Sequence, residues 1–354
     1  MNKFDLFELH DCEQDKRTRG WIKLGGEGLI KEIKNILLKD IKKGYTIYSI
    51  SDVIAKNIGV DQDTVFRALR PIINNEWERR KNCIAIQILK GLINVYNLEE
   101  QKGKFMDLTE WIISGASRSK PVKAVKTLTK ELAIIAGVYA ADGTLLRYKI
   151  KENSYQYRIM ICDEYKSSLE IVKELINRIF NLEVEIKKSE YDNSYLIVVD
   201  SKVFCRYFNK FLKFKYGKKT TTINIPQIIK DSNLEIQKSF VKGFVTFDGC
   251  IDIGGYFRLS IKNRRLIEEI NNVMKKDGIH INIKTEITRE GVNNIRSSVL
   301  KDKKFLDYFL KGSIKYERAK FFVDGNSNIN IFDLFSEKST NKINLKRMFE
   351  EIKL

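Results

Sequence analysis

Histidine and cysteine are scarce in this sequence. The chain has only two histidines, His10 and His280, and five cysteines that form no Cys-x-x-Cys pair. Zinc sites need clusters of these side chains, and disulfide frameworks need an even set of cysteines. The sequence therefore excludes histidine-rich metal centres, zinc ribbons and disulfide scaffolds. The dispersed thiols favour a reducing, cytoplasmic compartment.

Long apolar runs are missing as well. The best one, around Leu132–Ala141, has about ten residues, whereas a membrane span needs roughly 18. The segment Met1–Asp5 becomes acidic without the apolar core of a signal peptide. We expect no membrane partner and no secretion signal.

Positive charge is what the chain has in excess. Its 354 residues include 64 lysines and arginines against 46 acidic residues, a formal net charge of +18, and 43% are apolar. This composition indicates two or three globular units. The charge predicts a polyanionic partner, with nucleic acid ahead of an acidic membrane, because no long basic amphipathic helix dominates the sequence.

An internal repeat organises the second part of the chain. Pro121 and Pro226 each precede an Asp-Gly step by just over 20 residues, and further segments then match at offsets near 100 residues. The matched pairs are Tyr157–Ile161 with Phe257–Ile261, Phe204–Phe208 with Phe305–Phe309, and Lys215–Lys219 with Lys315–Lys320. We therefore expect two diverged copies of one unit, at residues 121–225 and 226–325.

Each copy combines helical and alternating segments. Period-2 alternation indicates half-buried strands, and a spacing near 3.6 indicates helices. The expected strands are Tyr155–Ile161, Tyr195–Val199, Phe257–Ile261 and Ile279–Ile283, and the expected helices include Tyr165–Phe180 and Arg264–Lys276. The order αββαββα in each copy predicts an α+β fold with mostly antiparallel sheets.

Residues 1–120 are rich in helix formers and lack alternation, which predicts a mainly α-helical N-terminal domain. Residues 51–70 have the spacing of a helix-turn-helix, with Gly59 at the turn and Asp61 capping the second helix. The outward residues that could meet a DNA groove are Gln62, Thr64, Arg67 and Arg70. An ordinary helical hairpin with a solvated basic face is the alternative. In the tail, residues 326–354, we expect a short helix over Ile343–Ile352.

The two Asp-Gly steps carry the chemistry. Gly137 and Gly243 lie within apolar helices, where a glycine costs about 1 kcal/mol relative to alanine. Close helix contact at these glycines explains them and brings Asp142 and Asp248 side by side, before glycines that end the helices as C-caps. A carboxylate there opposes the helix dipole by about 0.3–1 kcal/mol. A bound divalent cation makes a carboxylate at this position favourable instead. The pair of aspartates therefore predicts Mg²⁺ or Mn²⁺ as the cofactor and metal-dependent phosphodiester hydrolysis as the reaction.

The two motifs resemble those of a known family. The segments Ile135–Gly143 and Val241–Gly249 are similar to the signature nonapeptide of the LAGLIDADG (DOD-type) homing endonucleases, and the resemblance covers residues 121–325. It implies a pseudo-twofold pair of units with the motif helices at their interface. It also implies a saddle of antiparallel strands in the major groove of double-stranded DNA, a monomer with an internal pseudo-dimer, and divalent metals held by Asp142 and Asp248.

Further site residues follow from this resemblance. Main-chain carbonyls of Ala141 or Phe247 would assist at the metal. A basic residue that polarises the scissile phosphate is expected in each copy, within the clusters Lys218 and Lys219, and Arg318 and Lys320; the sequence does not choose within either cluster. The strand residues Arg158 and Arg258 either contact bases, bind phosphate or lie on a solvated face.

Some residues depart from the family pattern. Ala140 and Thr246 stand where an acidic residue is often found, and Phe247 is bulkier than the usual small residue. The ends at Met1 and Leu354 lack the splice-junction residues of an intein, so we expect a free-standing protein or one that has lost its splicing domains. The alternative function is a non-cleaving DNA-binding regulator, or an RNA-splicing maturase with intron RNA as its partner.

Overall fold

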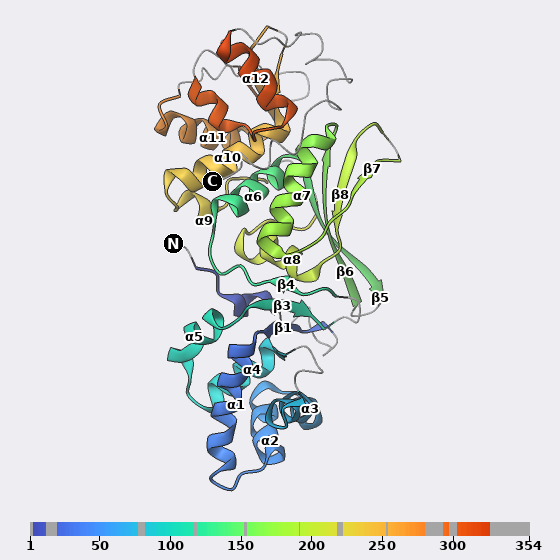
Figure 1. The fold of residues 1–354 in the computed structure, drawn as a ribbon, viewed down its shortest axis with the longest axis vertical. Coiled ribbons are helices and arrows are strands. Elements are labelled where there is room, and N and C mark those ends of the chain that lie inside the picture. Colours follow the sequence, from blue (N-terminus) through green and yellow to red (C-terminus); the bar gives the residue numbers. More distant parts are fainter. Residues whose placement is uncertain are drawn as a thin grey trace.

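The computed structural model is an elongated molecule, with the N-terminal region at its lower end and the repeated units above (Figure 1). The residues that it describes are 3–11, 20–76, 82–115, 119–151, 154–190, 192–217, 222–252, 254–279, 293–296 and 303–325. Two of the expected secondary-structure elements therefore fall wholly or largely outside the described residues, namely the helix at Ile343–Ile352 and the strand at Ile279–Ile283.

The N-terminal region is mainly helical, as expected, and it also contains a small antiparallel sheet. Its helices are η1 (Leu6–Leu9), α1 (Glu27–Ile41), α2 (Ile47–Ile58), α3 (Gln62–Ile73), α4 (Ile86–Val95), η4 (Glu99–Gln101) and α5 (Lys102–Asp107). The strands β1 (Ile22–Gly25), β2 (Cys83–Ala85), β3 (Trp111–Ser114) and β4 (Val122–Lys123) pair in the order β2-β1-β3-β4. These strands have two to four residues, too few for alternation to be visible in the sequence.

The helix pair α2–α3 has the local geometry that the sequence predicts. Thr46 caps α2 through a reciprocal bond with Ser49, and the helix ends at Gly59 in the left-handed conformation, φ +67°. The Asp61 carboxylate accepts a hydrogen bond from the Thr64 amide at 3.0 Å and so caps α3. A left-handed turn residue favours glycine, which fixes the position of this turn.

The first copy has the order αββαββα. It contains α6 (Lys130–Asp142), β5 (Gly143–Lys151), β6 (Ser154–Asp163), α7 (Lys166–Phe180), β7 (Ile186–Lys188), β8 (Tyr195–Val199) and α8 (Lys202–Arg206), which continues into a π-helical turn, η5 (Tyr207–Phe211). The strands form an antiparallel sheet in the order β5-β6-β8-β7. The expected strands and helices of this copy are confirmed.

The second copy repeats most of this order. Its elements are α9 (Gln227–Lys230), α10 (Leu234–Asp248), β9 (Gly249–Ile251), β10 (Phe257–Ile261), α11 (Arg264–Lys276), β11 (Asn293–Arg296), η6 (Lys303–Tyr308) and α12 (Ile314–Asp324). The described strands pair antiparallel in the order β11-β10-β9. The fold class is therefore α+β with two antiparallel sheet units behind a helical region. No described helix combines the length and apolar character required to cross a bilayer.

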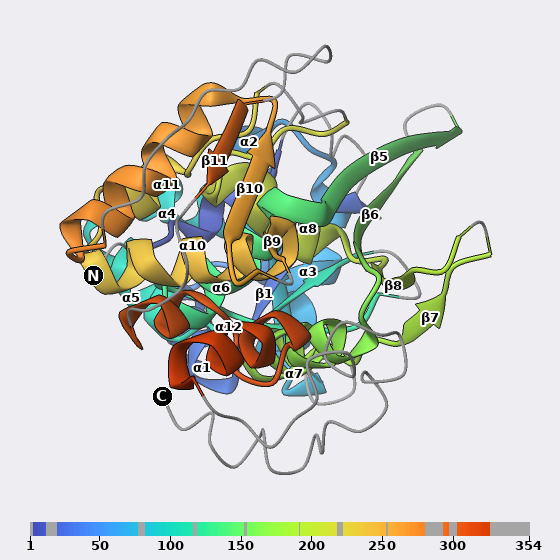
Figure 2. The same ribbon diagram turned by 90° about the horizontal axis from the view of Figure 1, so that it is seen from above.

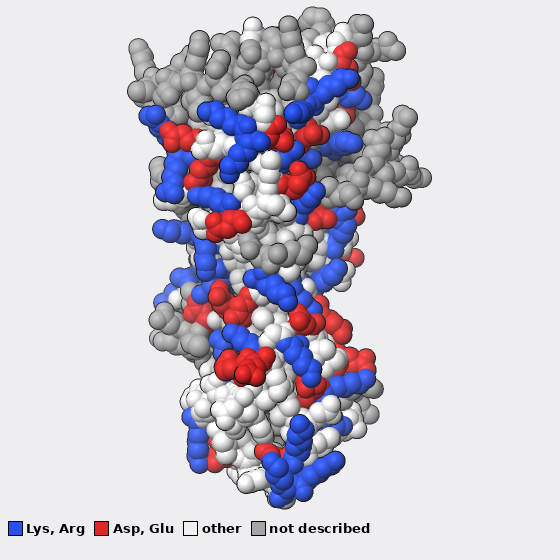
Figure 3. All heavy atoms as spheres, turned by 90° about the vertical axis from the view of Figure 1, so that its left-hand side faces the viewer, with Lys and Arg blue, Asp and Glu red and all other residues white. Residues whose placement is uncertain are grey.

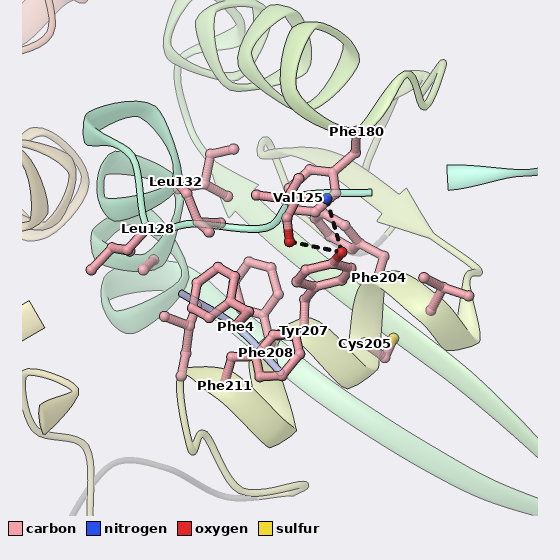
Figure 4. Close-up of a cluster of buried hydrophobic side chains, with 14 of the residues drawn as sticks. Phe4, Val125, Leu128, Leu132, Phe180, Phe204, Cys205, Tyr207, Phe208 and Phe211 are labelled. Atoms are coloured by element: carbon pink, nitrogen blue, oxygen red, sulfur yellow. Dashed lines mark hydrogen bonds between the residues drawn. The ribbon is translucent and has the colours of Figure 1, made fainter. Parts of the chain in front are cut away.

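The N-terminal segment packs against the first copy (Figure 4). The Phe4 ring stacks on Phe211 with centroids 4.6 Å apart, and the Tyr207 hydroxyl donates to the Val125 carbonyl at 3.1 Å and accepts from its amide at 2.9 Å. The Asp11 carboxylate lies 2.8 Å from the Lys210 amine. The predicted boundary at residue 120 is thus bridged, since residues 3–11 pack on the first copy and β4 belongs to the N-terminal sheet.

The helices α6 and α10 lie side by side within the repeated units (Figures 1 and 2), and their backbones are in direct contact at two glycines. A Cβ atom on Gly137 would overlap the Phe240 carbonyl oxygen, and one on Gly243 would overlap that of Ile134. An ion pair of 3.0 Å between Lys130 and the Glu235 carboxylate joins the two N-terminal ends. The helices therefore run parallel, and their C-terminal ends lie on the same side of the crossing.

Replacing either glycine tests this crossing. We expect Gly137→Ala or Gly243→Ala to lower the free energy of unfolding by about 3 kcal/mol or more, because the added methyl meets rigid backbone rather than a mobile side chain. Gly103→Ala is the matched control, since its Cβ would meet open space in helix α5. Urea unfolding curves provide the measurement, and near-native stability of both interface variants would contradict the packing.

Candidate functional site

The last residues of α6 and α10 are Asp142 and Asp248. Asp142 is exposed and Asp248 is partly exposed. Because the helices run parallel, both carboxylates lie at the same end of the pair. Each is followed directly by the first residue of a strand, at β5 and β9. The site therefore lies where the helix pair meets both sheets.

The glycines after the aspartates cap the C-terminal ends of α6 and α10, as expected. Gly143 and Gly249 have extended backbone, with φ of −88° and −74°. A Cβ atom at these positions would collide with Tyr139 and with the Val245 carbonyl, respectively. Glycine is needed here because the chain turns from helix into strand against the preceding helical turn.

Two residues that the sequence did not single out belong to this end of the helix pair. The Lys315 amine, on α12, donates a hydrogen bond to the Phe247 carbonyl. Asp163, at the end of β6, is buried and accepts a bond from the Tyr165 amide at 2.8 Å. Burial raises the pKa of Asp163 to about 7; Lys315 opposes this rise and the nearby charge of Asp142 adds to it. Charges from both copies therefore converge here.

The basic residues expected near the scissile phosphates have different surroundings. Arg318 is buried on α12, where its guanidinium donates to the Tyr165 hydroxyl at 3.1 Å and lies over that ring. Lys320 is exposed, and Lys218 and Lys219 lie outside the described residues. The basic residue that lies at the C-terminal end of the helix pair is instead Lys315. The signal that could have found it was its alignment with Lys215 in the repeat.

The two strand arginines each form an ion pair. The Arg158 guanidinium donates to both oxygens of Asp200, at 2.7 and 2.8 Å, and this contact raises the arginine pKa and lowers that of Asp200. Arg258 lies 2.6 Å from the Asp252 carboxylate. Both arginines alternate with buried neighbours and so lie on the sheet faces away from the core. A base or phosphate contact would have to compete with these carboxylates.

The four candidate residues of the α2–α3 pair divide into two groups. Arg67 and Arg70 are exposed, and Arg67 lies 2.5 Å from Asp63 of its own helix. Gln62 instead donates its amide to the Tyr48 carbonyl at 2.9 Å and ties α3 to α2. Thr64 is half-buried beside a cavity of about 390 Å³. Gln62 is partly exposed as well as bonded within the helix pair, and its contact with DNA stays a prediction.

The donors at the helix ends fit a magnesium or manganese ion that is completed by its substrate. Among the described residues there is no group of three or more His, Cys, Asp and Glu side chains that could enclose a metal. Mg²⁺ commonly uses one or two carboxylates together with water and substrate phosphates. The accessible pair Asp142 and Asp248 matches that set. The Phe247 carbonyl, expected as a further ligand, already accepts the Lys315 hydrogen bond.

The side of the molecule that faces left in Figure 1 carries charges of both signs. Figure 3 shows lysines and arginines interspersed with acidic side chains on this side of the molecule. Within the part of the chain that is described, this face does not form a continuous basic band.

Comparison with protein-family models gave no match. Among curated proteins, the chain is 26% identical over 231 residues to a glutamine–fructose-6-phosphate aminotransferase of Methanocaldococcus jannaschii, covering 63% of this chain and 19% of the relative. It is 28% identical over 176 residues to an A-type ATP synthase component of Pyrococcus abyssi, covering 49% and 16%. The chain spans less than a fifth of the length of either relative.

The solved structures similar to this chain include homing endonucleases. The complex of I-DmoI with DNA and manganese is 21% identical, with a TM-score of 0.39, and covers 57% of this chain and 100% of that chain. Mesophilic variants from the homing endonuclease I-DmoI are 24% identical, with a TM-score of 0.41 and coverage of 51% and 89%. A mutant of I-SmaMI is 11% identical, with a TM-score of 0.37 and coverage of 62% and 96%.

The raised pKa of Asp163 predicts a pH-dependent stability. The native state binds this proton more tightly than the unfolded chain, whose pKa is near 3.8, so stability falls as pH rises from about 4 to 7. Asp163→Asn removes the ionising group and keeps the shape. We expect the metal-free variant to lose less stability than the native chain between pH 5 and pH 8 in urea titrations. Equal losses in both proteins would show that Asp163 ionises normally.

Proposed function

We propose that this protein is a site-specific endonuclease that hydrolyses phosphodiester bonds of double-stranded DNA with a divalent metal. The observation that carries the proposal is the parallel helix pair, which holds Asp142 and Asp248 at the same end, beside the first strands of both sheets. Two like charges at helix C-termini are unfavourable unless a cation offsets them. The net charge of +18 suits a polyanionic substrate.

The residues at this end of the helix pair have different roles in the proposed reaction. Asp142 and Asp248 would hold Mg²⁺ or Mn²⁺, which would supply Lewis-acid polarisation of the scissile phosphate and activation of the attacking water. Lys315 fixes the Phe247 carbonyl and offsets the acidic charge around it. Because each copy contributes one aspartate and one sheet, each strand of a duplex would meet an equivalent half of the site, which permits cleavage of both strands.

The comparison with the curated relatives supports an endonuclease that is inserted into otherwise unrelated proteins. Their names describe two different activities, and the matched segments make up 19% and 16% of their lengths. The part that this chain shares with each relative is therefore separable from the activity that the relative's name describes. We therefore take the shared part to be an inserted endonuclease, of the kind that accompanies introns and inteins.

Loss of either aspartate tests the proposal. We expect Asp142→Asn and Asp248→Asn to reduce Mg²⁺-dependent cleavage of the cognate duplex by at least about a hundredfold. DNA affinity should be retained, because each substitution removes a negative charge. Asp231→Asn, at the end of the short helix α9, serves as the surface control. Supercoiled plasmid carrying the native insertion locus reports nicks and double-strand breaks. No metal-dependent cleavage by the native chain would exclude the endonuclease.

A non-cleaving DNA-binding regulator is the second candidate, and the α2–α3 pair favours it. The turn at Gly59 and the cap at Asp61 give the geometry in which a second helix enters a major groove. In the endonuclease, the same pair would add affinity outside the cleavage site. If the regulator is correct, native protein and the aspartate variants bind alike, and none of them nicks DNA.

The exposed arginines of α3 give a separate prediction. We expect Arg67→Ala and Arg70→Ala each to weaken binding and to reduce the slope of log affinity against log salt by about 0.9 per lost phosphate contact. Lys39→Ala, exposed on α1, is the charge-matched control. Fluorescence anisotropy at several salt concentrations measures the slopes. Unchanged slopes in both arginine variants would mean that α3 faces solvent in the complex.

A further inference from the structure

The sheet of the first copy has one face turned away from the core. Alternate residues Leu145, Ile159, Ile161, Ile197 and Val199 are buried beneath the helices. The intervening residues form what we call the open face. Its central members are Thr144, Leu146, Met160, Cys162, Leu196 and Val198, all of them partly exposed.

The strand register arranges the open face in rows. Thr144 pairs with Met160, which pairs with Val198 on the next strand. Cys162 pairs with Leu196 in the neighbouring row. The centre of the face is therefore apolar over three adjacent strands, β5, β6 and β8.

The only cation in the central strand β6 is already neutralised. Arg158, which pairs with Leu146, directs its Nε and Nη2 atoms to the two carboxylate oxygens of Asp200. This bidentate contact occupies two of the guanidinium N–H donors that would otherwise recognise a guanine edge. The first copy thus presents methyl and methylene groups where a guanine-reading surface would present free donors.

Among the exposed basic residues described on the edge strands β5 and β7, Lys187 shares the open face, where it pairs with Leu196. Arg147 and Lys149 on β5, and Lys188 on β7, alternate with residues of the open face, so these three lie on the opposite face. Strands lie about 4.8 Å apart, so the edges of a four-stranded sheet are separated by roughly 14 Å, close to the roughly 12 Å width of a major groove. The open face therefore offers a basic side chain, Lys187, for a phosphate at the β7 edge, and an apolar surface for the bases beside it.

The corresponding positions of the second copy are more polar. On β9 and β10 the residues that alternate with the buried ones are Cys250, Arg258 and Ser260, all exposed. The two sheets therefore present different chemistry to the two halves of a duplex.

We propose that the open face of the first sheet recognises its half-site through the C5 methyl groups of thymine. This methyl is the apolar group that the major groove offers, and it distinguishes A·T pairs from G·C pairs. The inference rests on the proposed binding of double-stranded DNA and adds its specificity: a target rich in A·T pairs under the first copy and different in composition under the second. Met160 and Leu196 are the central contacts.

Selection from random DNA identifies the half-site. The full chain, with Ca²⁺ in place of Mg²⁺, selects from a pool of duplexes with a randomised core, and the same selection is run with Met160→Arg. The half whose preferred bases change belongs to the first copy. We expect A·T-rich sequence there in the native selection, with guanine gained opposite the new arginine.

Replacing thymine by uracil in the selected duplex then removes single methyl groups. We expect affinity to fall about fourfold per contacted methyl in the first half-site and to change little in the second. Met160→Ala should abolish part of this loss, whereas Ser260→Ala, on the second sheet, should leave it intact. Circular dichroism verifies that both variants are folded.

The outcomes separate this inference from the proposed function. Specific binding with a G·C-rich first half-site, or with no effect of uracil, overturns methyl recognition and leaves the endonuclease standing. Failure to select any duplex overturns both.

Discussion

The backbone contact between α6 and α10 is the constraint on which the rest of the structure depends. Gly137 and Gly243 each lie against a carbonyl of the opposite helix, and any larger residue would separate the pair. This contact fixes the relation between the two copies. It places Asp142 and Asp248 at one end and directs a sheet from each copy away from that end. An unfavourable pair of carboxylates is retained at the point where a phosphodiester and a cation would meet them.

Much of the fold could be predicted because its signals are local. The strands Tyr195–Val199 and Phe257–Ile261 and the helix Arg264–Lys276 have the bounds that alternation and apolar spacing indicated. The N-terminal sheet was not predicted, because strands of two to four residues are too short to show the alternation of apolar and polar residues. The Asp-Gly pairs were visible as a repeat, but the extended backbone of Gly143 and Gly249 was not, since it depends on how tightly each strand folds back on its helix.

The missed site residues share a physical reason. Lys315 and Asp163 lie 152 positions apart in the sequence, and they influence one another only because the copies pack through their helices. No periodicity reports such a meeting. The hydrogen bond of the Gln62 amide to a carbonyl of the preceding helix was likewise not visible in the sequence. Residues whose role depends on a partner in another element are the ones that sequence patterns miss.

The most direct test of the account is the position of a divalent metal. Crystals of the full chain with its cognate duplex and Mn²⁺ would locate the ion by its anomalous scattering. We expect manganese within coordination distance of the carboxylates of both Asp142 and Asp248, next to a phosphate of the duplex. Manganese bound elsewhere, with neither aspartate among its ligands, would contradict it.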